Sequence, residues 1–95
     1  MIEESRGLLT PEAAELLALD AFGWLAGEDD ALGRFLALSG IGPAALRSAS
    51  REPGFLAGVV AFLMADEPLL LAFAGHAGIP PGRVAAAHAV LNLEE

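Results

Sequence analysis

The stretch LGRFLALSGIGPAALR, from Leu32 to Arg47, predicts a helix, a sharp glycine corner and a second helix. The apolar residues before the corner follow helical spacing, which places them on one face of a helix. Gly40 comes next, and a glycine can end a helix in the left-handed conformation without a side-chain clash. Ile41 can then fold back onto the last helical turn. Pro43 suits the first position of a new helix, where its missing N–H would have no partner anyway.

The same corner returns 38 residues later, in Gly78, Ile79 and Pro81. The offset extends upstream, where the acidic pair Glu28-Asp29 aligns with Asp66-Glu67. We therefore predict an all-α fold, a compact bundle of about six short helices in two similar three-helix halves with G-I-x-P corners, at about residues 11–49 and 51–91. An alternative is that helical bundles commonly need such corners and that two of them coincide. No segment alternates polar and apolar residues over a sustained run, so we predict no strands.

Length, composition and charge limit what the chain can be. A chain of 95 residues favours one domain, which we place at residues 10–95 behind a mobile N-terminal arm, residues 1–9. Without cysteine, disulfides and cysteine-ligated metals are excluded. The acidic residues outnumber the basic ones by 13 to 5, which opposes non-specific binding to nucleic acid. The start of the chain does not look like a signal peptide, and the apolar run from Phe55 to Ala65 is too short to span a bilayer. We expect a cytoplasmic protein with no membrane segment.

Two long segments carry a family resemblance. They are GWLAGEDDALGRFLALSGIGPAALR and EPGFLAGVVAFLMADEPLLLAFAGHAGIPP. Together they resemble a family of small alphaproteobacterial proteins that is catalogued only as a domain of unknown function. The resemblance covers Leu9 to Leu91, and its most specific parts are Trp24-Leu25 before the acidic run and Asp66-Glu67 before the leucine run. It implies a small cytoplasmic all-helical protein with no assigned activity and no catalytic residues.

The sequence gives no support for catalysis, a cofactor or a metal, and we predict that the protein is not an enzyme. His76 and His88 fall on different predicted helices and lack metal-ligand spacing, so we interpret both as ordinary, partly buried histidines. The two acidic runs would converge on a hard cation if the halves packed around a pseudo-twofold axis. Helix capping by Asp29 and Asp66 explains the same residues without an ion.

Our leading functional hypothesis is a protein-interaction or adaptor module that binds an unknown protein partner or a second copy of itself as a homodimer. The fourth and fifth predicted helices are apolar on nearly all sides, and such helices need burial beyond one partner. The expected interaction surface comprises Val59, Val60, Leu69 and Leu71.

The alternative hypothesis is weak binding to the phosphate backbone of DNA. The run from Leu38 to Pro43 is similar to the hairpin of helix-hairpin-helix modules, in which backbone amides hold a phosphate. Gly40, Gly42 and Arg47 would form this site. Pro80-Pro81 removes amide donors from the second corner, and the net charge of −8 repels a duplex, so both features disfavour nucleic acid as a partner.

Overall fold

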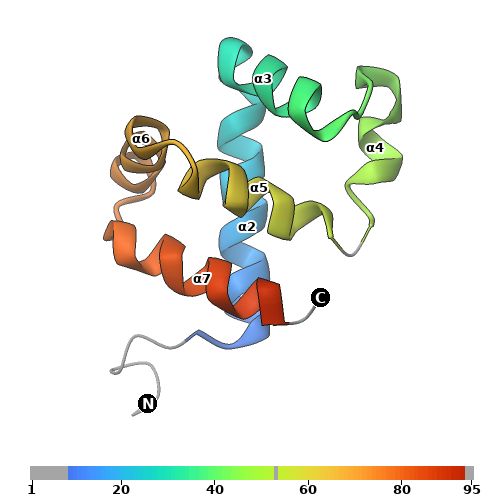
Figure 1. Cartoon of the computed structure of the whole chain (residues 1–95). Coiled ribbons are helices and arrows are strands. Elements are labelled where there is room, and N and C mark those ends of the chain that lie inside the picture. Colours follow the sequence, from blue (N-terminus) through green and yellow to red (C-terminus); the bar gives the residue numbers. More distant parts are fainter. Residues whose placement is uncertain (1–8, 53, 94–95) are drawn as a thin grey trace.

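The computed structural model describes residues 9–52 and 54–93, and within them the chain is helical with no strand. Figure 1 shows the arrangement, and its labels are used from here on. The elements are α2 (Pro11–Ala26), α3 (Asp29–Ser39), the 3-10 turn η1 (Pro43–Ala45), α4 (Leu46–Ala49), α5 (Phe55–Met64), α6 (Glu67–Ala77) and α7 (Pro81–Leu93). The all-α prediction is confirmed. The predicted N-terminal arm lies outside the described residues except for Leu9, which is buried in the core and so does not belong to an arm.

Three helices build the core. In Figure 1, α5 and α7 both cross α2, and all three pack against one another. On α2 the buried face consists mainly of alanines, which allow the other two helices to approach closely, while α5 and α7 supply larger side chains. The buried residues of these helices are Ala14, Ala18, Ala21 and Leu25 on α2, Phe55, Ala57, Val59, Val60 and Leu63 on α5, and Val84, Ala87 and Leu91 on α7.

The other helices cover the edges of this core, each through a few anchors. Phe35 fixes α3, and Phe73 fixes α6 beside the ring of Trp24, 5.7 Å away between ring centroids. Trp24 is only half-buried, so it borders the core rather than filling it. α3 and α4 lie beside α5 but leave part of its surface uncovered, and residues of all three helices line a hollow there.

Both predicted corners have the expected geometry. Gly40 and Gly78 end α3 and α6 with φ of 75° and 71°, and each donates its N–H to the carbonyl four residues before it. α3 and α6 have the same length, and their bounds keep the offset of 38 residues. The elements after the corners differ, because η1 and α4 are short and α7 has 13 residues. Helices from both predicted halves share one core, so the halves do not pack as separate units.

The capping residues were predicted in part. Thr10 accepts a hydrogen bond from the N–H of Ala13, and Asp66 accepts one from the N–H of Leu69. The capping role expected for Asp29 was wrong, because Asp29 is already the first residue of α3. Glu28 occupies the cap position without a capping hydrogen bond from its side chain. α3 therefore starts without the stabilisation of about 1 kcal/mol that a side-chain cap gives.

None of the helices within the described residues has the length and apolar character needed to cross a membrane by itself. α5 and α6 reach that length and apolar character only when taken together, and the pair is bent by 110° at the break between the two helices.

Candidate functional site

The interaction surface predicted from the sequence was wrong in half of its residues. Val59 and Val60 are completely buried, because they lie on the face of α5 that packs into the core with α2 and α7. Leu69 is half-buried, and Leu71 is 49% exposed on α6. The open surface of α5 is therefore not the valine face.

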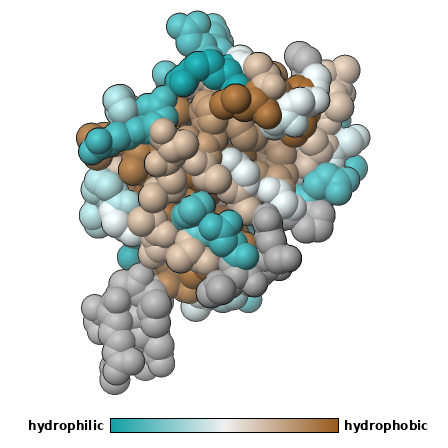
Figure 2. All heavy atoms as spheres, in the orientation of Figure 1, coloured by the Kyte–Doolittle hydropathy of each residue, from teal (hydrophilic) through white to brown (hydrophobic). Residues whose placement is uncertain are grey.

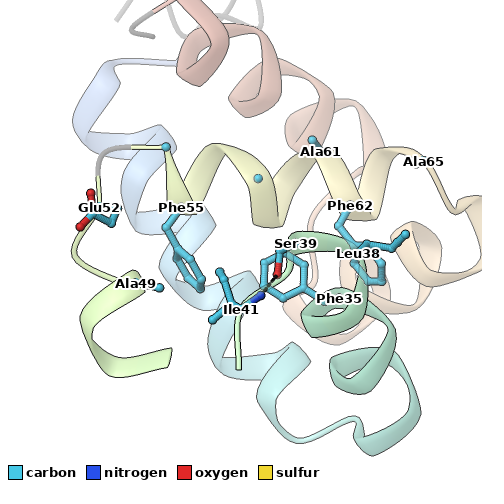
Figure 3. Close-up of a pocket in the computed structure, with 12 residues that line it drawn as sticks. Phe35, Leu38, Ser39, Ile41, Ala49, Glu52, Phe55, Ala61, Phe62 and Ala65 are labelled. Atoms are coloured by element: carbon cyan, nitrogen blue, oxygen red, sulfur yellow. Dashed lines mark hydrogen bonds between the residues drawn. The ribbon is translucent and has the colours of Figure 1, made fainter. Parts of the chain in front are cut away.

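An apolar groove of about 600 Å³ lies along the uncovered face of α5 (Figure 3). Its walls come from α3, from the corner after it and from the end of α4. Figure 2 shows apolar residues over much of the face that is turned to the viewer in Figure 1, with hydrophilic residues among and around them. The lining residues are Phe35, Leu38, Ser39, Ile41, Ala49, Glu52, Gly54, Phe55, Gly58, Ala61, Phe62 and Ala65. We call this feature the α5 groove.

Small residues form the floor of the α5 groove. Gly54, Gly58, Ala61 and Ala65 are spaced by four, three and four residues, which places them on one face of α5 and its flanking turns. A Cβ atom added at Gly58 would meet no atom within 4 Å. The groove is thus open because this face of α5 carries only glycine and alanine, and no other part of the described chain fills the space.

Aromatic rings form the walls and keep them apart. The ring of Phe35 contacts those of Phe55 and Phe62 edge-on, at centroid distances of 5.7 and 5.4 Å, and Phe55 also contacts Phe22 at 5.0 Å. Figure 3 shows Phe55 and Ile41 toward the Glu52 end, and Phe62 and Leu38 toward the Ala65 end. Edge-to-face pairs contribute about 0.5–1.5 kcal/mol each beyond area burial. This linked set resists collapse of the groove.

Leu38 stands at the rim with 78% of its surface exposed. Full burial of a leucine side chain stabilises by about 1.5–3 kcal/mol. Because Leu38 stays exposed to water, the chain by itself lacks most of this stabilisation. The neighbouring Ser39 fixes the corner, because its Oγ donates to the carbonyl of Leu36 and accepts from the N–H of Ile41. The rim is therefore apolar and held in place at its turn.

Charged residues border the groove at both ends. At one end the Arg34 guanidinium lies 3.1 Å from a carboxylate oxygen of Asp66 and 5.6 Å from the centre of the Phe62 ring. At the other end Glu52 lines the groove, and Arg51 directly precedes it in the chain. Arg47 lies on α4, two residues before the lining residue Ala49.

Two of the three residues of the DNA hypothesis, Gly40 and Gly42, lie at the corner after α3. The N–H of Gly40 is bonded to the carbonyl of Leu36 and is therefore not free to donate to a phosphate. The next element is the three-residue turn η1 and not a helix with a row of free amides. Arg47 follows on α4 with its side chain exposed. Phosphate binding at this corner stays a prediction without support from the local geometry.

Histidines and acidic residues do not gather into a metal site within the described part of the chain. His76 lies beside Trp24, with ring centroids 6.4 Å apart, and His88 shares a hydrogen bond with Asn92. One Asp66 oxygen bonds the N–H of Leu69 and the other pairs with Arg34, so this carboxylate already has two partners. A smaller hollow of about 250 Å³ lies between α2, α6 and α7.

Sequence reasoning missed the α5 groove as a site, although one signal for it was present. The glycines and alanines on one face of α5 were visible as a spacing pattern, but the helix was interpreted as apolar on all sides. Which face meets the core depends on tertiary packing and not on the local pattern.

Comparison with known proteins adds a family. No curated protein and no solved structure matches the chain significantly. The profile of a family described as a protein of unknown function matches residues 11–93. The resemblance stated from the sequence, to a family with no assigned function, is thereby confirmed. The chain belongs to the DUF3572 family of proteins of unknown function.

Proposed function

We propose that this protein is an interaction module that binds a helix of a partner protein in the α5 groove. The observation that carries the proposal is an open apolar groove of about 600 Å³ with Leu38 exposed at its rim. Exposed apolar patches on small proteins often mark interaction sites.

The walls of the groove favour a helix over an extended strand as the bound segment. A strand binds by adding to an open sheet edge, where main-chain groups lack partners. Here the walls are helices, and their backbone groups are bonded within the helices, except at their ends. An amphipathic helix needs only apolar contacts, and it presents them at positions i, i+3, i+4 and i+7.

The small floor residues suit such a partner. Packed helices approach to about 8–10 Å between axes, and the distance depends on the side chains at the contact. The small residues Gly58 and Ala61 allow the axis of a partner helix to approach that of α5 to the shorter distances in this range. Phe35 and Phe62 give the groove apolar walls. Binding would also cover Leu38, which the chain alone leaves in water. The proposal assigns no catalytic step to the chain.

Photo-cross-linking in the native cell tests this function. A photoreactive amino acid at position 38 should give an adduct with a protein segment that carries apolar residues at i, i+3, i+4 and i+7. The matched control places the same group at Leu19, which is 51% exposed on α2 and does not line the groove. Adding Gly58→Leu to the position-38 chain should remove the adduct. Equal adducts at both positions, or an adduct that Gly58→Leu leaves unchanged, would overturn the proposal.

A further inference from the structure

Basic residues outnumber acidic ones in the segment of this acidic chain that forms the α5 groove. The whole chain has 13 acidic and 5 basic residues. Between residues 31 and 65, the segment that holds every lining residue of the groove, there are three arginines and the single acidic residue Glu52. Asp66, just beyond this segment, pairs with Arg34 at one end of the groove. The basic surplus therefore lies at the other end, where Arg47 and Arg51 stand against Glu52 alone.

The three arginines are placed to meet a bound segment. Arg34 lies against the Phe62 ring at one end of the groove, and Arg47 and Arg51 lie in and after α4 at the other. All three are exposed. Arg34 pairs with Asp66, whereas the described residues include no ion-pair partner for Arg47 or Arg51. Exposed guanidinium groups form charge-assisted hydrogen bonds with carboxylates, commonly in a bidentate geometry.

We infer that the partner helix is acidic, with an apolar stripe for the groove and Asp or Glu residues flanking the stripe that meet Arg47 and Arg51. This inference rests on the proposed helix-binding function and specifies its partner. Opposite charges at the rim of an interface steer encounter and select partners more than they add affinity. An acidic partner also needs this basic surface, because the rest of the chain repels it.

A second copy of the chain is a poorer occupant. A twofold dimer places the same surface of each copy against the other, so a dimer through this groove would bring its arginines into proximity across the axis. Like charges that face each other in this way disfavour the pairing. The charge at the groove therefore favours a different, acidic molecule.

The test uses two synthetic helical peptides with the same leucine stripe, one flanked by glutamates and the other by lysines. Fluorescence anisotropy with labelled peptides measures the Kd of each for the full chain. Exposed ion pairs contribute about 0.2–1 kcal/mol each, so two or three of them predict about tenfold tighter binding of the glutamate peptide at low salt. The difference should shrink in 1 M salt, where the Debye length falls to about 3 Å.

Charge-reversal variants assign the effect to the groove. The double variant Arg47→Glu/Arg51→Glu should abolish or reverse the preference for the glutamate peptide. Arg83→Glu on α7 is the control, because Arg83 is exposed but lines a different hollow, the one between α2, α6 and α7. If Gly58→Leu removes peptide binding but the glutamate and lysine peptides bind equally well, the acidic partner is overturned and the helix-binding function remains. If neither peptide binds in a way that Gly58→Leu weakens, or if the chain forms a dimer that this substitution dissociates, both the acidic partner and the helix-binding function are overturned.

Discussion

Gly58 gives a test of the α5 groove that needs no partner. A glycine inside a helix destabilises by about 0.5–1 kcal/mol relative to alanine. Gly58 lies within α5, and a Cβ there would meet no atom within 4 Å. Gly58→Ala should therefore raise the free energy of unfolding by about 0.5–1 kcal/mol. For a domain of this size, 1 kcal/mol shifts the Tm by about 4–8 °C.

A larger side chain extends the same argument. Leucine has nearly the helix propensity of alanine, and at position 58 its side chain would lie in the apolar groove that Phe35 and Phe55 also line. Gly58→Leu should therefore be at least as stable as the natural chain. In most packed cores such an enlargement costs about 1–3 kcal/mol, so the expected sign depends on the groove being open.

Urea unfolding followed by far-UV circular dichroism measures both variants. Gly75→Ala is the matched control, because Gly75 lies inside α6, faces open space and does not line the groove. Its gain should equal that of Gly58→Ala. A loss of more than about 1 kcal/mol for Gly58→Leu, with a normal gain for Gly75→Ala, would show that the groove is filled in solution and would refute the reasoning.

Four further predictions concern the fold and the alternative function. Phe73→Ala should destabilise the fold by about 3–5 kcal/mol, because Phe73 is only 1% exposed and anchors α6. Urea unfolding will detect this loss, and a change below about 1 kcal/mol would contradict the assigned core. Asp66→Ala should lower the free energy of unfolding by about 0.5–2 kcal/mol, measured by thermal melts, because it removes the α6 cap. Glu28→Ala should lower it hardly at all because Glu28 makes no capping hydrogen bond, and equal losses for the two variants would be inconsistent with these caps. Gly40→Ala should destabilise by about 1–2 kcal/mol, since φ at this residue is 75°, and a stabilised variant would rule out the left-handed corner. If the hairpin binds phosphate, Arg47→Glu should weaken a salt-sensitive complex with labelled duplex DNA, and no mobility shift of the duplex by the natural chain at low salt would remove that alternative.

The local features of this fold could be predicted from the sequence, because local chemistry determines them. The two glycine corners have positive φ values that other residues rarely adopt, so Gly40 and Gly78 were recognisable beside their isoleucines and prolines. Thr10 and Pro11 are local signals of the same kind, since Thr10 caps α2 and Pro11 is its first residue. These positions depend on a few neighbouring residues, and the structure confirms them.

The site could not be predicted in the same way, because it depends on which helix faces meet. α5 is apolar on nearly all sides, so its sequence pattern does not show which face meets the core and which face stays open. Packing against α2 and α7 buries Val59 and Val60, while the glycine and alanine face remains uncovered. The expected role of Asp29 was wrong for a local reason, since α3 begins at Asp29 itself and Glu28 occupies its cap position.

Nuclear magnetic resonance with the chain labelled at its glycines tests the central claim, that a helix binds along the α5 groove. The glycines are distributed over most of the helices and turns, so they report on nearly every surface of the fold. Titration with the glutamate-flanked helical peptide should shift the amide signals of Gly54 and Gly58 and leave those of Gly23, Gly75 and Gly82 in place. Shifts confined to those three glycines, or no shifts at peptide concentrations that saturate the anisotropy signal, would contradict the account.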